Sequence, residues 1–425
     1  MFSKSQYDLI VIGAGPGGCA AAAVAARGGL DVLLLERSME PAFKVGESLM
    51  PETYGTFEKM GALERMRSAG FVEKHSVQFF AKSGKASAPF YFSTVKSGEG
   101  ARTWQVLRSD FDQLLFEVAE EAGAECRRGV NARELVTEGE RVVGVTVDAG
   151  GERVELGSKV LIDATGQSAL VSRRFDLGRI DYGLQHASIF THFEGARRDS
   201  GIDEGATLVL HTSEGHTWFW FIPLAGDVTS VGVVGRLDAL VRGREGTPEE
   251  VFFEEVAKCP EIADRLAEAS RCRPFAVCKD FSYRCERMAG DGWVLVGDAF
   301  SFIDPVYSSG VFLALKSGEL AAETAAVAIA DGDVSGERLG AFQSELERAI
   351  SAVHRLVQAF YSRDFSFGEF LRMFPHLQRS VTRILIGDVF DSSYDDLFQA
   401  METFRLERAD TVSLSPTELS AGGAA

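Results

Sequence analysis

The feature that most constrains the fold of this 425-residue chain is a glycine-rich turn near its N-terminus. Residues 7–12 form an apolar run of strand length, residues 13–18 read Gly-Ala-Gly-Pro-Gly-Gly, and an alanine-rich helical segment follows. Glycines at the G-x-G-x-x-G spacing allow a tight turn, a close approach of the backbone to a pyrophosphate, and close packing of the helix on the strand. An acidic residue ends the next apolar run, where it would accept hydrogen bonds from a ribose. The pattern predicts a Rossmann-type dinucleotide-binding domain with contacts from Gly13, Ala14, Gly15, Gly18, Glu36 and Arg37.

A second loop suited to a ligand lies in the last third of the chain. Residues 293–296 form an apolar run typical of a buried strand, Gly297-Asp298 comes next, and Ser309-Gly310 opens a long helical run. The start of a helix has unpaired N–H groups and the positive end of the helix dipole, so it favours an anion. Asp298, at the end of a strand, is placed to accept hydrogen bonds from a polyol. A capped helix after a core strand is the alternative interpretation.

The spacing Phe302-x-x-Pro305-x-x-Ser308-x-Gly310 in this loop resembles a motif of the flavin-dependent halogenases, specifically their phenol- and pyrrole-acting branch. These enzymes are related to the FAD-dependent aromatic monooxygenases. The resemblance covers nearly the whole chain. Tyr307 stands where the tryptophan-acting branch has a glutamate, which argues against free tryptophan as substrate. The resemblance implies that FAD contacts Asp298 and Pro305, and that chloride or bromide binds at the backbone of Ser309 and Gly310.

Three other motifs carry the same resemblance. Gly46-Glu47-Ser48 corresponds to a loop that lies across the flavin in the family, and Arg108 follows a Trp-Gln-Val stretch whose neighbours hold FAD. The stretch Asp-Ala-Thr-Gly at residues 163–166 recurs in FAD-dependent aromatic hydroxylases, and therefore favours FAD over NAD. The alternative for these polar residues is helix capping, by Ser48 with Glu52 and by Ser109 with Asp112.

Lys74 occupies the position of the catalytic lysine of the family. Relatives place Gly-Ala two residues after this lysine, whereas the present chain has Ser76-Val77. Taken alone, a lysine at the entrance of a strand is usually a solvated surface charge. Lys82 and Lys85 lie close by in sequence and are the competing candidates.

The stretch Thr-Trp-Phe-Trp-Phe-Ile-Pro at residues 217–223 contains the W-x-W-x-I-P pattern typical of the halogenases. In a strand, Trp218 and Trp220 face one side, while Phe219 and Phe221 face the other. In the family this pair of indoles forms a wall that keeps the organic substrate away from the flavin. An aromatic core between two layers is the alternative interpretation.

Together these patterns predict an α/β fold: a Rossmann-type FAD-binding domain with an inserted, mainly antiparallel β substrate layer and a C-terminal helical region. We expect the FAD-binding domain to be discontinuous, over residues 1–74, 104–180 and 286–330. The substrate-side β-sheet domain would take residues 75–103 and 181–285. A C-terminal helical region is expected over residues 331–408, and a small, polar stretch at residues 409–425 is expected to be a disordered tail.

Composition restricts the partners and the compartment. A net charge of −18 and a pI of about 5.0 argue against nucleic acid and anionic membranes. The six cysteines form no C-x-x-C pair, as expected for reduced thiols in a cytoplasmic protein. The seven histidines show no metal-binding spacing, so no metal is predicted. The longest apolar stretch, residues 9–26, contains too many glycines for a membrane span or a signal peptide.

The resemblance implies a flavin-dependent halogenase. A separate NAD(P)H-dependent flavin reductase would supply reduced FAD, and O2 with chloride or bromide would then give hypohalous acid. Lys74 would deliver the halogen, as a chloramine or through a hydrogen bond, to an electron-rich aromatic substrate of phenol or pyrrole type. That substrate would be free or tethered to a carrier protein. An FAD-dependent monooxygenase or reductase of the same fold, and a catalytically inactive FAD-binding paralogue, are the two alternatives.

Overall fold

A mainly parallel sheet carries the N-terminal glycine turn in the computed structural model, which describes residues 2–362 and 364–413. Its strands follow the order β17-β18-β10-β1-β2-β7. The short strand β17 is antiparallel to β18, and every other neighbouring pair in this order is parallel. The antiparallel hairpin of β8 and β9 extends from β10. The strand bounds are β1 Gln6–Ile12, β2 Val32–Glu36, β7 Glu125–Arg128, β8 Val130–Glu138, β9 Arg141–Ala149, β10 Glu152–Asp163, β17 Ala289–Gly290 and β18 Trp293–Leu295.

Helix α1 (Pro16–Arg27) follows the glycine turn and packs against α9 (Ser309–Asp331). Glycine is required at two places of this arrangement. Gly13 has a φ of +101°, and a Cβ added at Gly18 would lie 1.8 Å from the carbonyl oxygen of Gly13. The G-x-G-x-x-G spacing is therefore enforced by the turn itself and by the close contact of helix and strand.

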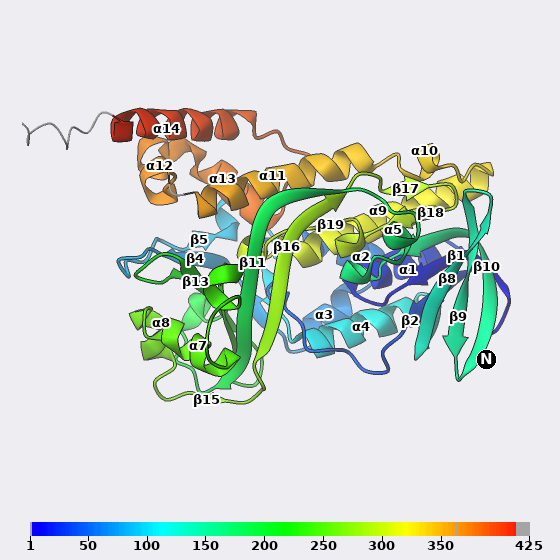
Figure 1. The fold of residues 1–425 in the computed structure, drawn as a ribbon, viewed down its shortest axis with the longest axis horizontal. Helices are drawn as coiled ribbons and strands as arrows, with labels where there is room; N and C mark the ends of the chain where they lie inside the picture. Colours follow the sequence, from blue (N-terminus) through cyan, green and yellow to red (C-terminus); the bar gives the residue numbers. More distant parts are fainter. Residues whose placement is uncertain (1, 363, 414–425) are drawn as a thin grey trace, which may run out of the picture.

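A second, mainly antiparallel sheet of nine strands forms the other layer. In Figure 1 two long strands, β11 and β16, run side by side from the region of the first sheet into this layer. β12 and β4 form its one parallel pair within the described residues, and β3 pairs with β6 in a separate two-stranded ribbon. The bounds are β3 Val72–Lys74, β4 Ser76–Phe80, β5 Phe90–Tyr91, β6 Thr103–Gln105, β11 Arg179–Glu194, β12 Thr207–His211, β13 Thr217–Pro223, β14 Val228–Arg236, β15 Ser270–Arg271, β16 Ala276–Cys285 and β19 Ser301–Phe302.

Helices cover both layers, and the C-terminal ones lie along one edge of the molecule (Figure 1). Two short helices, α7 and α8, pack on the second sheet, and they are separate because Pro260 begins a new helix after Cys259. The remaining bounds are α2 Thr53–Met60, α3 Leu63–Ser68, α4 Arg108–Glu121, α5 Leu170–Arg174, α6 Leu237–Leu240, α7 Pro248–Val256, α8 Pro260–Arg265, α10 Gly336–Leu339, α11 Gln343–Tyr361, α12 Phe367–Met373, α13 Gln378–Ile386 and α14 Asp395–Ser413.

The fold class is the predicted one, an α/β architecture with a Rossmann-type layer, a mainly antiparallel β layer and a helical C-terminal region. The proposed domain bounds stay a prediction. Helix α14 continues to Ser413, past the expected start of the tail at residue 409, and residues 414–425 lie outside the described part of the chain. Within residues 2–362 and 364–413, no helix is both long and apolar enough to cross a membrane.

Candidate active site

A cavity of about 740 Å³ joins the glycine turn after β1 to the inner face of the second sheet. Its wall includes residues that are far apart in the sequence, from the turn, from the loop after β18, and from β13. Eleven of the predicted site residues line it: Gly13, Gly15, Glu36, Arg37, Ser48, Arg108, Trp218, Trp220, Asp298, Pro305 and Gly310. Four predicted site residues do not line the cavity. Three of them, Ala14, Gly18 and Ser309, are next in sequence to a lining residue, and the fourth, Lys74, donates a hydrogen bond to the lining residue Ser48.

The turn at one end of this cavity suits a pyrophosphate. Gly15 is the N-cap of α1 and makes no side-chain cap, and a Cβ added to it would meet nothing within 4 Å. The first amides of α1 therefore lie at the cavity wall without a side-chain partner, where the helix dipole favours an anion. Glu36 accepts hydrogen bonds from the backbone N–H of Ala14 at 2.9 Å and of Ser38 at 2.9 Å. These contacts fix the carboxylate at the cavity wall, and a carboxylate there suits a ribose hydroxyl, so the residues present fit FAD.

The loop before Ser48 is tied to helix α4 by Arg108. Its guanidinium donates to both carboxylate oxygens of Asp112, at 2.9 Å each, and to the carbonyl oxygen of Val45. Asp112 therefore pairs with Arg108 instead of capping α4, which begins at Arg108 without a side-chain cap, so the capping alternative for Ser109 and Asp112 is wrong.

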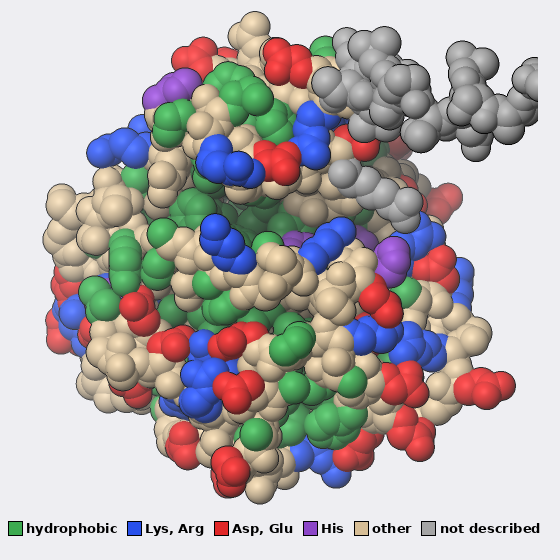
Figure 2. Space-filling view, turned by 90° about the vertical axis from the view of Figure 1, so that its left-hand side faces the viewer, with side chains coloured by type: hydrophobic (Ala, Val, Ile, Leu, Met, Phe, Trp, Pro, Cys, Tyr) green, Lys and Arg blue, Asp and Glu red, His purple; other side chains and the backbone are tan. Residues whose placement is uncertain are grey.

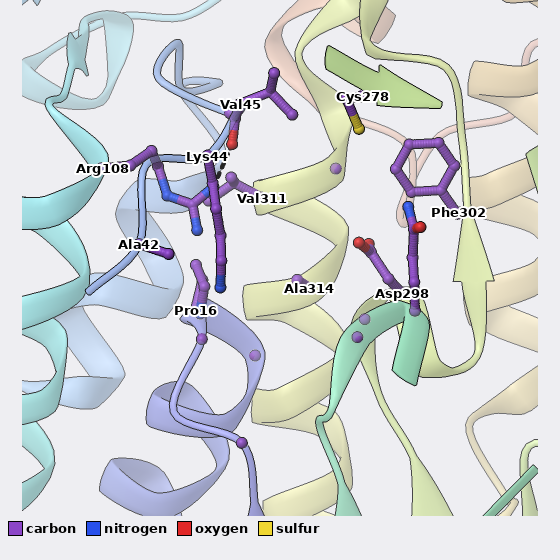
Figure 3. A pocket seen from close by; sticks show the side chains of 18 of the residues that line it. Pro16, Ala42, Lys44, Val45, Arg108, Cys278, Asp298, Phe302, Val311 and Ala314 are labelled. Atoms are coloured by element: carbon purple, nitrogen blue, oxygen red, sulfur yellow. Dashed lines mark hydrogen bonds between the residues drawn. The ribbon is translucent and has the colours of Figure 1, made fainter. Parts of the chain in front are cut away.

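Lys44, in the same loop, is a cavity residue that the sequence analysis missed. Figure 3 shows its side chain reaching toward Pro16 at the start of α1. Its place in the sequence, two residues before the Gly46-Glu47-Ser48 motif, could have indicated a cation at the cofactor site. Desolvation raises the pKa of Asp298 to about 6, against the opposing effect of the Arg108 and Lys44 charges.

The start of α9 presents an uncapped helix end to the cavity. Ser308 adopts a left-handed conformation with a φ of +59° and makes no side-chain cap. Gly310 lines the cavity, whereas Ser309 is fully buried and its hydroxyl has no hydrogen-bond partner among the described residues. Gly310 therefore lies at the cavity and the Ser309 side chain does not, while halide binding by the two backbone amides stays a prediction. Tyr307 is buried and donates to the carbonyl oxygen of Leu356 in α11 at 3.3 Å.

Strand β13 divides its aromatic side chains as its alternation predicted. Trp218 and Trp220 line the cavity, with ring centroids 6.4 Å apart, while Phe219 packs against Phe252 of α7 on the opposite face. The indole N–H of Trp220 donates to Ser230 at 3.1 Å. A second polar contact ties Trp218 to the C-terminal region, since its N–H donates to the hydroxyl of Tyr361 in α11 at 2.8 Å. The two rings are therefore fixed in place at the cavity wall.

Lys74 is buried, with 3% of its surface exposed, so the interpretation as a solvated surface charge is wrong. Its Nζ donates to the Ser48 hydroxyl at 2.8 Å and to the Leu49 carbonyl oxygen at 3.0 Å. Burial lowers the pKa of this lysine to about 7, because the interior disfavours the charged form. The competing candidates Lys82 and Lys85 are both exposed. Lys74 reaches the cavity through its partner Ser48.

A hollow with hydrophobic side chains on its floor opens below the C-terminal helices, on the face shown in Figure 2. This end of the molecule contains a cluster of aromatic rings between the second sheet and α11. Phe79 packs edge-on against Phe90 and Tyr307, and Phe360 packs against Tyr307 and Trp218. The cluster therefore connects the start of α9 with the indole wall.

Two buried histidine–carboxylate pairs near the cavity were also missed. His192 lies 2.8 Å from Glu47, and His186 lies 2.8 Å from Asp304. Only Glu47 had been singled out, as part of a motif, because each partner belongs to a different element and no local spacing connects them. Among the described residues, no group of three or more histidine, cysteine, aspartate or glutamate side chains is arranged to hold a metal ion.

Residues 6–356 match a family model described as an FAD binding domain. The chain is 33% identical to a 1H-pyrrole-2-carbonyl-[peptidyl-carrier protein] brominase of Pseudoalteromonas luteoviolacea, over 92% of this chain and 94% of that protein. A 1H-pyrrole-2-carbonyl-[peptidyl-carrier protein] chlorinase of Pseudomonas fluorescens is 29% identical over 94% and 93% of the two chains. The solved structure of the flavin-dependent brominase Bmp2 superposes with a TM-score of 0.84 and 31% identity, over 96% of this chain and all of that one. The chain therefore belongs to the flavin-dependent halogenases, which are FAD-dependent oxidoreductases.

Proposed function

We propose that this enzyme halogenates an electron-rich ring of phenol or pyrrole type, with Lys74 delivering the halogen. The observation that carries this proposal is the burial of Lys74 next to Ser48, which lines the cavity. An exposed lysine holds its proton at neutral pH, whereas the burial of Lys74 provides a fraction of free amine. A free amine has the lone pair that attack on an electrophilic halogen requires.

The rest of the cavity divides into a cofactor part and a halide part. Gly13, Gly15 and the first amides of α1 would hold the pyrophosphate of FAD, and Glu36 its ribose. Arg108, Ser48, Asp298 and Pro305 would lie along the remainder of the cofactor. The amides of Ser309 and Gly310 would hold chloride or bromide at the positive end of α9. Bound FAD, supplied in its reduced form by a separate flavin reductase, contributes the reducing power that turns O2 and halide into hypohalous acid.

The indole wall separates the organic substrate from this chemistry. Trp218 and Trp220 stand at the cavity face of β13, and Phe79, Tyr307 and Phe360 lie beyond them. We propose that the substrate ring binds on the side of this aromatic cluster and meets the halogen only through Lys74. A ring that cannot reach the cofactor is halogenated and not hydroxylated.

Two relatives, and a tyrosine instead of a glutamate at position 307, support a substrate of phenol or pyrrole type. The brominase and the chlorinase reported above are named for a pyrrole-2-carbonyl group on a peptidyl-carrier protein. We propose the same kind of carrier-tethered pyrrole as the first substrate to test, with free phenols as the second. A cytoplasmic location stays a prediction.

The test is an incubation of the protein with reduced FAD, O2 and either chloride or bromide, with a pyrrolyl carrier protein and a panel of phenols. We expect a product mass that shifts with the halide and shows the matching isotope pattern. The variant Lys74→Ala should lose this product, whereas Lys82→Ala and Lys85→Ala should retain it. A hydroxylated product that forms without halide would instead support the monooxygenase alternative. FAD binding without any product across the panel would support the inactive paralogue.

A further inference from the structure

Two hydroxyl groups meet at the end of the cavity that lies next to Lys74. Ser48 belongs to the loop before α2 and Thr207 begins β12, and both residues line the cavity although each is only 3% exposed. Their oxygens lie 2.8 Å apart, and either can be the donor. Lys74 Nζ lies 2.8 Å from the Ser48 oxygen. The lysine is therefore one hydrogen bond away from a pair of hydroxyls at the cavity wall.

A third side chain fixes the direction of hydrogen bonding in this group. The amide nitrogen of Gln105 donates to the carbonyl oxygen of Gly205 at 2.9 Å and to the Thr207 hydroxyl at 2.8 Å. A carbonyl oxygen only accepts, so the amide must present its nitrogen on this side. Gln105 therefore donates to Thr207, as Lys74 donates to Ser48.

One of the two hydroxyl hydrogens of Ser48 and Thr207 is left without an acceptor in this group. Each hydroxyl has a single hydrogen, and each oxygen already accepts one bond, from Lys74 or from Gln105. The contact between Ser48 and Thr207 uses one of the two hydroxyl hydrogens, whichever residue donates it. The other has no acceptor among the described residues, and both residues line the cavity. The pair thus offers one hydrogen-bond donor to a molecule inside the cavity.

We propose that the Ser48–Thr207 hydroxyl pair binds the oxygen of hypohalous acid, and that Ser48 relays a proton while the halogen passes to Lys74. This inference rests on the proposed function and adds to it a binding point and a catalytic role for Ser48. Thr207 and Gln105 are positioning residues, since they act by holding the Ser48 hydroxyl.

The step balances without another reactant. The neutral amine of Lys74 attacks the halogen, so an N–halogen bond forms while the oxygen–halogen bond breaks. The amine nitrogen gives a proton to the Ser48 oxygen, and Ser48 gives its hydroxyl hydrogen to the departing oxygen. The products are a haloamine at Lys74 and one molecule of water. The halogen is transferred as X⁺ and keeps its formal +1 state, so no other oxidant or reductant is needed, and Ser48 ends as it began.

The test supplies hypochlorous acid directly to the full-length protein, loaded with oxidised FAD so that none is generated in place. The readout is the fraction of Lys74 peptide that exchanges one hydrogen for one chlorine, measured by mass spectrometry after a short pulse. We expect Ser48→Ala and Thr207→Val to lower the rate of this exchange by about tenfold, the effect of one lost hydrogen bond of ordinary strength. Thr207→Ser keeps the hydroxyl and should restore the parent rate.

Ser76→Ala is the matched control, because Ser76 is also a buried serine close to Lys74 but its hydroxyl has no partner among the described residues. It should chlorinate Lys74 at the parent rate. Circular dichroism, which does not depend on contacts with the cofactor, shows which variants are folded, and Thr207→Val tests the inference even if Ser48→Ala does not fold.

Parental rates in both Ser48→Ala and Thr207→Val would overturn the inference and leave delivery by Lys74 intact. An equal loss in Ser76→Ala would overturn it as well, since a general disturbance would then explain the effect. If Lys74 of the parent protein takes up no chlorine at all, delivery by Lys74 fails together with the relay.

Discussion

The burial of Lys74 predicts that the stability of this protein depends on pH in a particular direction. We consider the substitution Lys74→Met, which keeps an unbranched chain of similar length and removes the titrating group. Folding lowers the pKa of Lys74 from 10.5 to about 7. In the unfolded chain the lysine stays protonated up to its ordinary pKa, whereas in the folded protein it loses its proton above about pH 7. Between these two pH values the unfolded state binds more protons, so the stability of the parent protein rises with pH.

The size of the effect follows from the shift. Where the lysine is protonated in the unfolded state only, the free energy of unfolding rises by about 1.36 kcal/mol per pH unit. Between about pH 6 and about pH 9 this condition holds over about two pH units, from the folded-state pKa upward. The free energy of unfolding of the parent protein, minus that of Lys74→Met, should therefore rise by about 2.5 kcal/mol over this range. The variant also leaves the Ser48 hydroxyl and the Leu49 carbonyl without a donor, but that cost is the same at both pH values.

Urea unfolding of both proteins at the two pH values measures this difference, and all other titrating groups cancel in the subtraction. Lys82→Met, at an exposed lysine, controls for the loss of one surface charge. If the free energies of unfolding of the parent and of Lys74→Met differ by the same amount at both pH values, the amine is not desolvated. Lys74 would then not be a neutral nucleophile near pH 7.

Three other outcomes are expected. Trp220→Ala opens the indole wall, and should raise peroxide release and hydroxylated product relative to halogenated product; an unchanged ratio in product analysis would favour an aromatic core with no shielding role. Lys74→Arg should lose ring halogenation in the product assay, because a guanidinium stays protonated and cannot form a comparable haloamine; full activity would show that hydrogen bonding from a cation suffices. Gly18→Ala places a Cβ 1.8 Å from the Gly13 carbonyl oxygen, so FAD binding, measured by fluorescence titration, should be lost; parental affinity would mean that the turn is not the pyrophosphate site.

Local patterns predicted those parts of the molecule whose structure depends on near neighbours. The turn at Gly13 and Gly18 is dictated by contacts within a few residues, and it has the expected form. The alternation of Trp218 and Phe219 follows from strand geometry alone, and the structure places them on opposite faces. The helix starting at Ser309 was likewise evident from its apolar run.

Contacts over long sequence separations were not predictable in the same way. Ser48 and Thr207 are 159 positions apart, and their hydroxyls meet because Ser48 pairs through its backbone with Gln105, whose side chain donates to Thr207. The burial of Lys74 depends on this same arrangement, so a lysine expected from local rules to be solvated lies in the interior. Pairs such as His192 with Glu47 leave no local signature, because each partner has an ordinary pattern in its own element.

The central claim is that halogen reaches the ring through Lys74, after hypohalous acid has formed elsewhere. The most direct test follows two quantities in the same reaction, the halogenated ring and the hypohalous acid trapped by a thioether added outside the protein. For Lys74→Ala we predict that flavin reoxidation continues, that the trapped acid increases, and that the halogenated ring disappears. Ring halogenation at near the parent rate in Lys74→Ala, with no increase in the trapped acid, would contradict the account.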